Sequence, residues 1–295
     1  MRILLTGADG QLGKEIIKNT PDYVELIAMS KSEFNLYDLQ KCKNMVFQIK
    51  PDWIINAGAY TMVDLAEKEK RKALIINGKA PLVLSEALKE IGGKLLQIST
   101  DYIFDGNQTS PYQTEQDINP INYYGFTKAF SEKAIKKLLM PTKQGIILRT
   151  SWLVGTTGNN FLKTMLKMHA EREIIKVVKD QKGCLTTTLS LSKICWKIIF
   201  QDSRRIFPYR YQSILHWCDQ GVTSWYEIAE TIGEIGKNIG VLKKNAKVIP
   251  ISTSEYPTAA KRPKYSVLDC ETTKKLLNVE SRNWKDSLTE LMYEI

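Results

Sequence analysis

The sequence predicts an α/β fold: a Rossmann-like, doubly wound parallel sheet followed by a smaller C-terminal α/β substrate domain. Short apolar runs alternate with helical patterns through the first half of the chain, as expected when strands and the helices that cover them follow one another. A glycine turn, Gly7-Ala-Asp-Gly-Gln-Leu-Gly13, lies between the first apolar run and the first helical pattern. No low-complexity segment or long linker separates the two halves, which favours a second domain packed against the first.

The elements of the first half follow from these patterns. Strands are expected where short apolar runs lie between turn residues, over residues 2–6, 24–29, 53–56, 94–100 and 145–149. Helices are expected over residues 11–19, 66–72, 80–90 and 123–139. Because strands and helices alternate, we expect a parallel sheet with helices on both faces.

The second half is less regular. Helices are expected over residues 161–171, 189–200, 224–232 and 283–292, and a strand over 174–179. Thr223 or Ser224 is the expected N-cap of the third of these helices, and Gly183 and Pro208 are expected in loops. We expect an NAD(P)-binding domain over residues 1–150 and a mainly substrate-binding domain over 151–295, some segments of which return to pack on the first.

Composition narrows the function classes. The chain of 295 residues carries a formal charge of +10, but its lysines are spread along the sequence, so we expect no nucleic-acid partner. A modest positive field suits an anionic substrate such as a nucleotide-sugar pyrophosphate. No apolar run approaches the roughly 20 residues of a membrane helix, and no signal-peptide pattern is present. With five scattered cysteines and two histidines, we expect no metal site and a cytoplasmic protein with reduced thiols.

The glycine turn predicts a dinucleotide site. Gly7, Gly10 and Gly13 permit a tight turn, and the helix that follows offers free N–H groups to a pyrophosphate. The spacing is G-x-x-G-x-x-G rather than the dehydrogenase G-x-G-x-x-G, so a plain strand-to-helix turn is the alternative interpretation.

The end of the second strand bears on cofactor choice. The residues there are Ala28-Met-Ser-Lys31, without the acid that NAD-selective sites carry. Ser30 and Lys31 suit a 2′-phosphate, so NADPH is favoured over NADH; the alternative is that Lys31 is an ordinary solvated lysine. After the third strand, Ala57-Gly-Ala-Tyr60 has small residues where a cofactor can pass close to the backbone.

Tyr124 and Lys128 predict the chemistry. Residues four apart share one helix face, and an ammonium near a phenol lowers the phenol pKa from about 10, which makes a tyrosine a proton donor near neutral pH. Thr100, at the end of the fourth strand, is placed to hold a carbonyl oxygen. Ser99 is its rival, and Tyr123 is the rival of Tyr124, although only Tyr124 is four residues from Lys128. The set indicates ketone reduction, or alcohol oxidation, by a nicotinamide.

At this point the sequence resembles the extended short-chain dehydrogenase/reductases and, within them, the dTDP-4-dehydrorhamnose reductase family. The resemblance runs nearly end to end. It rests on these strings: Thr6-Gly-Ala-Asp-Gly-Gln-Leu-Gly13, Ile55-Asn-Ala-Gly-Ala-Tyr-Thr61, Ser99-Thr-Asp-Tyr-Ile-Phe-Asp-Gly106, Asn122-Tyr-Tyr-Gly-Phe-Thr-Lys128, Arg149-Thr-Ser-Trp152, Gly158-Asn-Asn-Phe161, Asp180-Gln-Lys-Gly183, Thr223-Ser-Trp-Tyr-Glu227 and Tyr256-Pro-Thr-Ala-Ala-Lys-Arg-Pro263.

The resemblance implies a role for each matching residue. Tyr124 would protonate the C4 oxygen of a dTDP-4-dehydro-L-rhamnose as hydride arrives from NAD(P)H, Lys128 would lower the pKa of Tyr124 and bond the nicotinamide ribose, and Thr100 would hold the carbonyl oxygen. The implied cofactor-binding residues are Gly7, Gly10, Gln11, Leu12, Gly13, Ser30, Lys31, Ala57, Gly58, Ala59, Tyr60, Asn77, Tyr124, Lys128 and Thr150. The implied substrate-binding residues are Val63, Thr100, Asp101, Tyr102, Tyr124, Trp152, Asn160 and Arg262, the last on the substrate pyrophosphate.

Several alternatives stay open. One is another nucleotide-sugar 4-ketoreductase or an epimerase of the same superfamily, which would retain its oxidised cofactor. Another, from a different class, is a non-catalytic nucleotide-binding protein resembling the regulatory subunit of methionine adenosyltransferase; the intact Thr100, Tyr124 and Lys128 argue against it. Some relatives dimerise, so a homodimer is compatible with the resemblance. The product implied is dTDP-L-rhamnose for a cell-surface polysaccharide.

Overall fold

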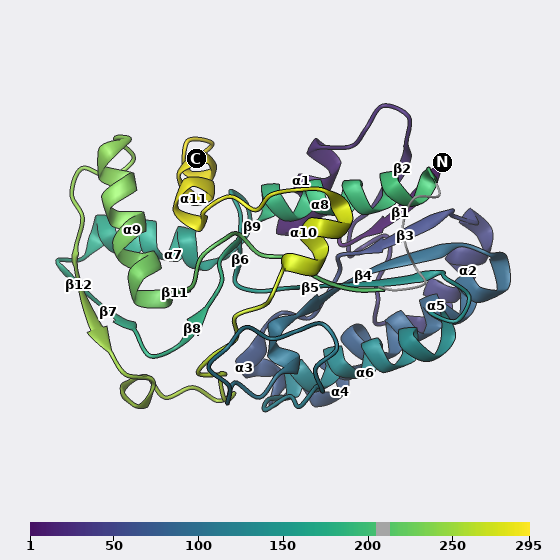
Figure 1. Cartoon of the computed structure of the whole chain (residues 1–295), viewed down its shortest axis with the longest axis horizontal. Helices are drawn as coiled ribbons and strands as arrows, with labels where there is room; N and C mark the ends of the chain where they lie inside the picture. Colours follow the sequence, from purple (N-terminus) through teal and green to yellow (C-terminus); the bar gives the residue numbers. More distant parts are fainter. Residues whose placement is uncertain (205–212) are drawn as a thin grey trace.

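A six-stranded parallel sheet forms the centre of the larger part of the molecule (Figure 1). The computed structural model describes residues 1–204 and 213–295, so Pro208 lies outside the described residues. The strand order is β10-β5-β4-β3-β1-β2. The strands are β1 (Arg2–Thr6), β2 (Glu25–Met29), β3 (Trp53–Asn56), β4 (Lys94–Thr100), β5 (Gly145–Thr150) and β10 (Ile214–His216). The predicted α/β class and doubly wound sheet are confirmed.

Alternate residues of the strands face two separate apolar layers. Ile3 and Leu5 of β1 pack with α1 (Gln11–Lys18), α8 (Thr188–Ser203) and α10 (Glu271–Leu277). Leu4, between them, faces the opposite layer, because successive side chains of a strand point to opposite faces. That layer contains α2 (Leu39–Ile49), α5 (Ala80–Ile91) and α6 (Tyr123–Leu138). Burial on both faces explains why the strands read as continuous apolar runs.

Two details of the first half differ from the sequence prediction. Helix α2 was not anticipated; the Asp38 side chain caps it by accepting from the Lys41 N–H at 3.0 Å. The single helix expected over residues 66–72 is wrong: α3 (Val63–Ala66) and α4 (Lys70–Leu74) replace it, and a π-helical turn, η1 (Ile75–Lys79), follows. The break between them places Glu67, whose carboxylate accepts from the Tyr123 N–H at 2.7 Å, so a long-range contact overrides the local helical pattern.

The second half of the sequence contributes to the sheet layer. Strand β10 extends the sheet by pairing in parallel with β5; its three residues are too few to stand out as a strand pattern, and it was not predicted. Helix α8 packs on α1, where Trp196 Nε1 donates to the Ile16 carbonyl at 3.2 Å and Ser192 Oγ donates to the Glu15 carbonyl at 3.1 Å. The chain therefore crosses back to the first half after residue 187.

The remaining elements form a smaller lobe with its own apolar cluster (Figure 1). Ser224 caps α9 and forms a capping box with Glu227, so Ser224 is the N-cap and the Thr223 alternative is wrong. The helices of this lobe are α7 (Phe161–Glu171), α9 (Trp225–Asn238) and α11 (Trp284–Met292). The paired strands are β6 (Leu153–Val154) with β9 (Thr186–Thr187), β7 (Ile174–Val178) with β12 (Lys247–Ile251), and β8 (Lys182–Gly183) with β11 (Thr223–Ser224). Gly183 therefore lies in a strand, and its expected loop position is wrong. Two short 3₁₀ turns are η2 (Asp101–Ile103) and η3 (Thr253–Glu255).

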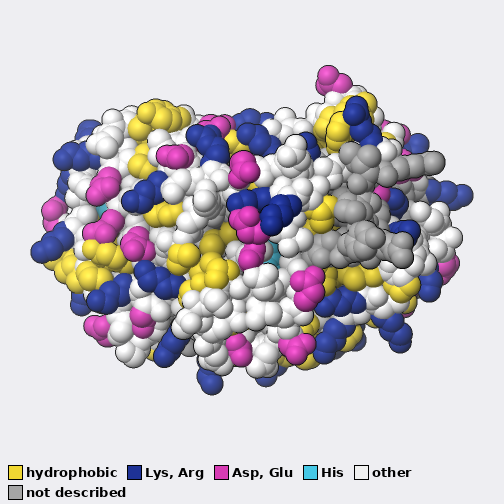
Figure 2. All heavy atoms as spheres, viewed as in Figure 1, with side chains coloured by type: hydrophobic (Ala, Val, Ile, Leu, Met, Phe, Trp, Pro, Cys, Tyr) yellow, Lys and Arg dark blue, Asp and Glu magenta, His cyan; other side chains and the backbone are white. Residues whose placement is uncertain are grey.

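The surface is mixed in charge. On the face in Figure 2, Lys and Arg side chains lie between Asp and Glu side chains over both lobes rather than in one basic patch. Within residues 1–204 and 213–295, no helix combines the length and apolar character needed to cross a bilayer.

The turn between β1 and α1 gives a stability prediction. A Cβ at Gly13 would lie 2.1 Å from the Gly7 carbonyl oxygen, whereas a Cβ at Gly10 would meet only that same oxygen, at 3.1 Å. We expect Gly13→Ala to lower the free energy of unfolding by about 1–3 kcal/mol and Gly10→Ala to lower it less, as measured by urea denaturation. Equal losses in the two variants would contradict the packing argument.

Candidate active site

The carboxyl ends of the parallel strands meet at one edge of the sheet, and a cavity of about 790 Å³ lies there. Loops and residues after β1, β2, β3, β4 and β5 line it. Of the residues expected in the site, the lining includes Gly7, Gly10, Gln11, Leu12, Lys31, Ala57, Gly58, Ala59, Tyr60, Thr100, Asp101, Tyr124, Lys128, Thr150, Trp152 and Asn160.

The β1–α1 turn is built for close backbone contact. Gly7 has a φ of +70°, and a Cβ there would lie 2.6 Å from Gly58 Cα. Gly10 precedes α1 without a side-chain cap, and the first turn of the helix carries no acid. Since the first N–H groups of a helix have no partners within it, the turn presents donors and the positive end of the helix dipole to the cavity. The arrangement fits a pyrophosphate.

A chain of hydrogen bonds crosses the sheet behind the cavity. Thr6 Oγ1 donates to Asn56 Oδ1 at 2.6 Å, and Asn56 Nδ2 donates to Gln97 Oε1 at 2.8 Å. Gln97 Nε2 in turn donates to the Ile98 carbonyl at 2.8 Å, and Lys128 Nζ donates to the same carbonyl at 2.6 Å. Thr6, Asn56 and Gln97, the three residues that form this hydrogen-bond series, are 0–1 % exposed. The glycine turn and the lysine of the Tyr-x-x-x-Lys pair are thus joined by fixed polar contacts.

Thr100 and Tyr124 lie together at the end of β4. The Thr100 hydroxyl accepts from the Tyr102 N–H at 3.2 Å and donates to Asp101 Oδ1 at 3.0 Å, and it also interacts with the Tyr124 hydroxyl. A Cβ at Gly125 would lie 2.0 Å from the Tyr102 carbonyl oxygen, so this glycine lets the start of α6 approach the strand end. The Tyr102 ring meets the Tyr124 ring edge-on, with centroids 6.0 Å apart.

The charge states differ from the simplest expectation. Burial raises the pKa of Tyr124 to about 12, with the Asp101 carboxylate as the second cause. The expected lowering of this pKa by Lys128 is absent here, because the ammonium is directed to the Ile98 carbonyl. Burial lowers the pKa of Lys128 to about 8, and the negative charge of Glu132 opposes that fall. Lys128 therefore stays cationic at neutral pH.

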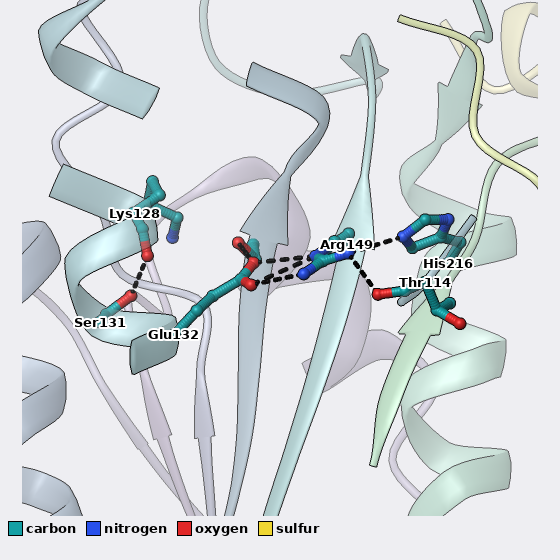
Figure 3. Close-up of polar contacts among 7 residues, drawn as sticks. Thr114, Lys128, Ser131, Glu132, Arg149 and His216 are labelled. Carbon is teal, nitrogen blue, oxygen red and sulfur yellow. Dashed lines mark hydrogen bonds and ion pairs between the residues drawn. The ribbon is translucent and has the colours of Figure 1, made fainter. Parts of the chain in front are cut away.

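Ser99, the rival of Thr100, also lines the cavity, but its hydroxyl is directed to Glu132. Its hydroxyl donates to Glu132 Oε1 at 2.6 Å, and Glu132 also pairs with Arg149, whose Nη2 lies 2.7 Å from Oε2. Figure 3 shows Arg149 reaching from its strand toward Glu132 on one side and Thr114 and His216 on the other. Thr100, with its hydroxyl beside Tyr124, is the better placed of the two to meet a carbonyl oxygen.

At the end of β2, Lys31 lines the cavity and Ser30 does not. The Ser30 N–H and hydroxyl both donate to Glu33 Oε2, at 2.9 and 2.7 Å. These hydrogen bonds lower the pKa of Glu33. A carboxylate therefore lies near the end of β2, two residues after Lys31.

Asn77 lies behind the cavity rather than in its lining. It is buried on η1, where its Oδ1 accepts from the Tyr60 N–H at 2.8 Å and its Nδ2 donates to the Tyr60 carbonyl at 2.9 Å. The structure thus gives Asn77 the position of a support for the loop after β3. Gly13, likewise outside the lining, packs on the Gly7 carbonyl.

Trp152 lines the cavity in a strained conformation. Its φ is +44°, in the left-handed region, which costs a non-glycine residue on the order of 1–3 kcal/mol. Its ring stacks on Trp225 with centroids 4.0 Å apart, and a Cβ at Gly183 would lie 2.6 Å from it. These contacts explain the glycine of the Asp180-Gln-Lys-Gly183 string. Asn160 caps α7, and its Nδ2 donates to Gln11 Oε1 at 2.6 Å, which ties the small lobe to the glycine turn.

Arg262 lies apart from the cavity described above. Its guanidinium forms a two-point ion pair with Asp64, at 2.6 and 2.5 Å. It lines a second cavity, of about 590 Å³, with Lys261 and Lys264. Val63, which precedes Asp64 at the start of α3, and Tyr102 line neither cavity.

Sequence reasoning left several lining residues without a role. For most of them the signal is their position in the loops that follow β1, β2, β3 and β5, where a parallel sheet collects its ligand contacts. Lys72 on α4, Ile76 on η1 and Ile98 inside β4 carry no such signal. The lining residues left without a role are Asp9, Phe34, Asn35, Leu36, Asn56, Thr61, Met62, Lys72, Ile76, Ile98, Ser151, Leu153, Gly158 and Asn159.

The fold and this strand-end cavity define a Rossmann-like nucleotide-binding α/β protein. A family model described as the RmlD substrate binding domain matches residues 1–295. The chain belongs to this family, and the resemblance to the dTDP-4-dehydrorhamnose reductases is confirmed.

The similarity to known proteins extends over nearly the whole chain. The dTDP-4-dehydrorhamnose reductase of Burkholderia thailandensis is 34% identical over 288 residues, covering 97% of this chain and 96% of its own. A solved structure of dTDP-4-dehydrorhamnose reductase from Clostridium acetobutylicum has a TM-score of 0.90 and 36% identity, covering 100% of this chain and 99% of its own. Another, from Bacillus anthracis in complex with NADP, has a TM-score of 0.87 and 33% identity, covering 100% and 99%.

The buried carboxyl group of Asp101 gives a pH prediction. Burial raises its pKa to about 7 from 3.8, so between these values the folded state holds a proton that the unfolded state releases. Stability then falls as pH rises through this window. Asn cannot ionise, so we expect the free energy of unfolding of Asp101→Asn, relative to wild type, to increase from about pH 4 to about pH 7, by at most about 4 kcal/mol. Urea denaturation at both pH values measures it.

Asp105→Asn is the control of opposite sign. A hydrogen bond from the Asn107 N–H lowers the pKa of Asp105, so its carboxylate stabilises the fold above the unfolded-state pKa, and that stability is lost as pH falls. This variant should lose stability relative to wild type as pH rises. A pH-independent difference for Asp101→Asn would contradict the prediction.

Proposed function

We propose that this protein reduces the 4-keto group of dTDP-4-dehydro-L-rhamnose with NADPH, giving dTDP-L-rhamnose for a cell-surface polysaccharide. The observation that carries the proposal is the meeting of Thr100, Tyr124 and Lys128 with the glycine turn in one cavity, in a chain whose full-length relatives are named dTDP-4-dehydrorhamnose reductases. A cytoplasmic location and a homodimer, without nucleic acid, belong to the same proposal.

The residues around the cavity fit a dinucleotide. Gly7 and Gly10 leave room at the uncapped start of α1 for a pyrophosphate, and Ala57 to Tyr60 form the opposite wall. When bound, the reduced nicotinamide supplies the hydride. Residues 1–150 form the cofactor-binding domain in this proposal, and residues 151–295 mainly the substrate-binding domain, with β10 and α8 packed on the first.

Side chains of this protein bind the carbonyl oxygen of the sugar and supply the proton that it receives. Thr100 donates a hydrogen bond to the carbonyl oxygen of the sugar and stabilises the negative charge that develops there. Tyr124 donates its proton to the same oxygen, and its high pKa keeps it protonated until that step. Lys128 provides the positive charge near the reacting groups. Trp152 forms the wall toward the sugar, and Arg262 exchanges its contact with Asp64 for the substrate pyrophosphate.

Lys31 gives a prediction on cofactor choice. Because Lys31 is the cation of the β2 end that lines the cavity, we expect Lys31→Ala to raise the KM for NADPH about tenfold and to leave the KM for NADH nearly unchanged. Lys14→Ala, on the exposed face of α1, is the matched control. A rise in both KM values would show that Lys31 does not meet a 2′-phosphate.

Tyr124→Phe tests the function itself. Removal of the proton donor should lower kcat by about 10²–10⁴-fold with little change in KM. The assay follows the absorbance of NADPH, with the keto-sugar generated by the enzymes that precede this step and the product identified by chromatography. Tyr123→Phe is the control, because the Tyr123 ring packs on Phe126 rather than in the cavity. Wild-type turnover in Tyr124→Phe would rule out the mechanism.

A further inference from the structure

A buried ion pair lies one helical turn along α6 from Lys128. Glu132 and Arg149 have side chains that are 0 % exposed. Arg149 Nε donates to Glu132 Oε1 at 3.0 Å and Nη2 donates to Oε2 at 2.7 Å. Burying two charges costs several kcal/mol that their attraction often fails to recover. A pair of this kind therefore calls for a reason other than stability.

Several polar groups contact the pair. Ser99 Oγ donates to Glu132 Oε1 at 2.6 Å, and Arg149 Nη1 donates to the Thr114 carbonyl at 3.0 Å and lies 3.1 Å from His216 Nε2. Burial and the charge of Arg149 lower the pKa of His216 to about 3, so this imidazole is neutral. The carboxylate of Glu132 is thus fixed by donors from β4 and β5.

The helix brings this carboxylate to the active site. Glu132 is four residues after Lys128 on α6, one turn along the same face, and Figure 3 shows both side chains projecting from that helix. Ser99 and Thr100 are neighbours at the end of β4, so the contact from Ser99 to Glu132 also fixes the strand end that carries Thr100. Glu132 itself does not line the cavity.

We propose that Glu132 is a positioning residue for the reduction: its carboxylate, held by Arg149 and Ser99, supports the ammonium charge of Lys128 and orients the end of β4. Glu132 touches neither substrate nor cofactor and acts through Lys128. The inference rests on the proposed function, because it assigns Glu132 a part in the same reaction.

The charged and titratable groups around Lys128 agree with this role. On α6, Glu132 raises the pKa of Lys128 against the effect of burial. Tyr124 on the same helix and Asp101 on η2 face the cavity, and both hold their protons more tightly because of burial. Arg149 of β5 is paired with Glu132 rather than directed at Lys128. Lys136, one turn beyond Glu132, has a pKa lowered by burial, and Glu132 opposes that fall as well.

Glu132→Gln tests the proposal. The amide keeps the shape and an acceptor for Ser99 but removes the charge, so Lys128 should lose its proton at a lower pH. We expect the alkaline limb of kcat/KM, which reports the free enzyme, to move down by about one pH unit. The same move should appear in the pH titration of the Lys128 ¹³Cε resonance, assigned by its absence in Lys128→Met.

Two further variants keep the test decisive if Glu132→Gln folds poorly. Glu132→Gln/Arg149→Met removes the unpaired guanidinium and should restore folding while the Lys128 titration stays below that of wild type. Glu132→Asp retains the charge and should keep the titration near that of wild type, even if thermal stability falls. A wild-type titration of Lys128 in both Gln variants would overturn the inference.

The two readouts separate this inference from the function. Wild-type protein that fails to reduce the keto-sugar would refute the proposed reaction, and with it the part given to Glu132 there. Normal wild-type turnover, combined with an unchanged Lys128 titration and an unchanged alkaline limb in Glu132→Gln, would refute the positioning role alone. A merely structural role predicts lower stability and a uniform loss of kcat/KM at every pH.

Discussion

The buried hydrogen bonds from Thr6 through Asn56 and Gln97 to the Ile98 carbonyl are the contacts on which the rest of the site depends. They cross β1, β3 and β4 immediately behind the cavity, and Lys128 ends on the same carbonyl. The side chains of Thr6, Asn56 and Gln97 each have a hydrogen-bond partner in a region without access to water. An unpaired polar group there would cost about 1–3 kcal/mol. The relative positions of the glycine turn and the lysine are therefore tightly defined.

Close backbone contacts at glycine residues also define the geometry of the cavity. The Gly7 backbone lies against Gly58, and Gly125 lets α6 lie against the Tyr102 carbonyl. The first contact brings together the two loops that would enclose a dinucleotide, and the second brings Tyr124 to Thr100. Since a side chain at Gly7 or Gly125 would displace backbone rather than a flexible group, the geometry of the cavity depends on where glycine occurs.

The electrostatics of the site come from burial combined with charge. Tyr124, Asp101 and Lys128 all have pKa values displaced toward their neutral forms by loss of water, and this is the pattern expected of functional groups in a cleft. Of these three residues, Lys128 is the one for which the negative charge of Glu132 opposes the displacement. The site thus places the protonated phenol of Tyr124 near the cation of Lys128, an arrangement suited to proton donation beside a developing negative charge.

Sequence patterns alone determined strands β1 to β5, the glycine turn and the placement of Tyr124 and Lys128 one turn apart on one helix, because strand runs, glycine spacing and a four-residue helical interval are local properties of the chain. The three-residue strand β10 and the break between α3 and α4 were not predictable in this way, since long-range pairing with β5 and the Glu67 contact decide them. The choice of Thr100 over Ser99 was already favoured by the resemblance, and the hydrogen bond from the Ser99 hydroxyl to Glu132 adds a structural reason for it. Sequence thus determined which chemical groups are present, whereas burial and contacts between distant segments decided which of them face the cavity and in which charge state.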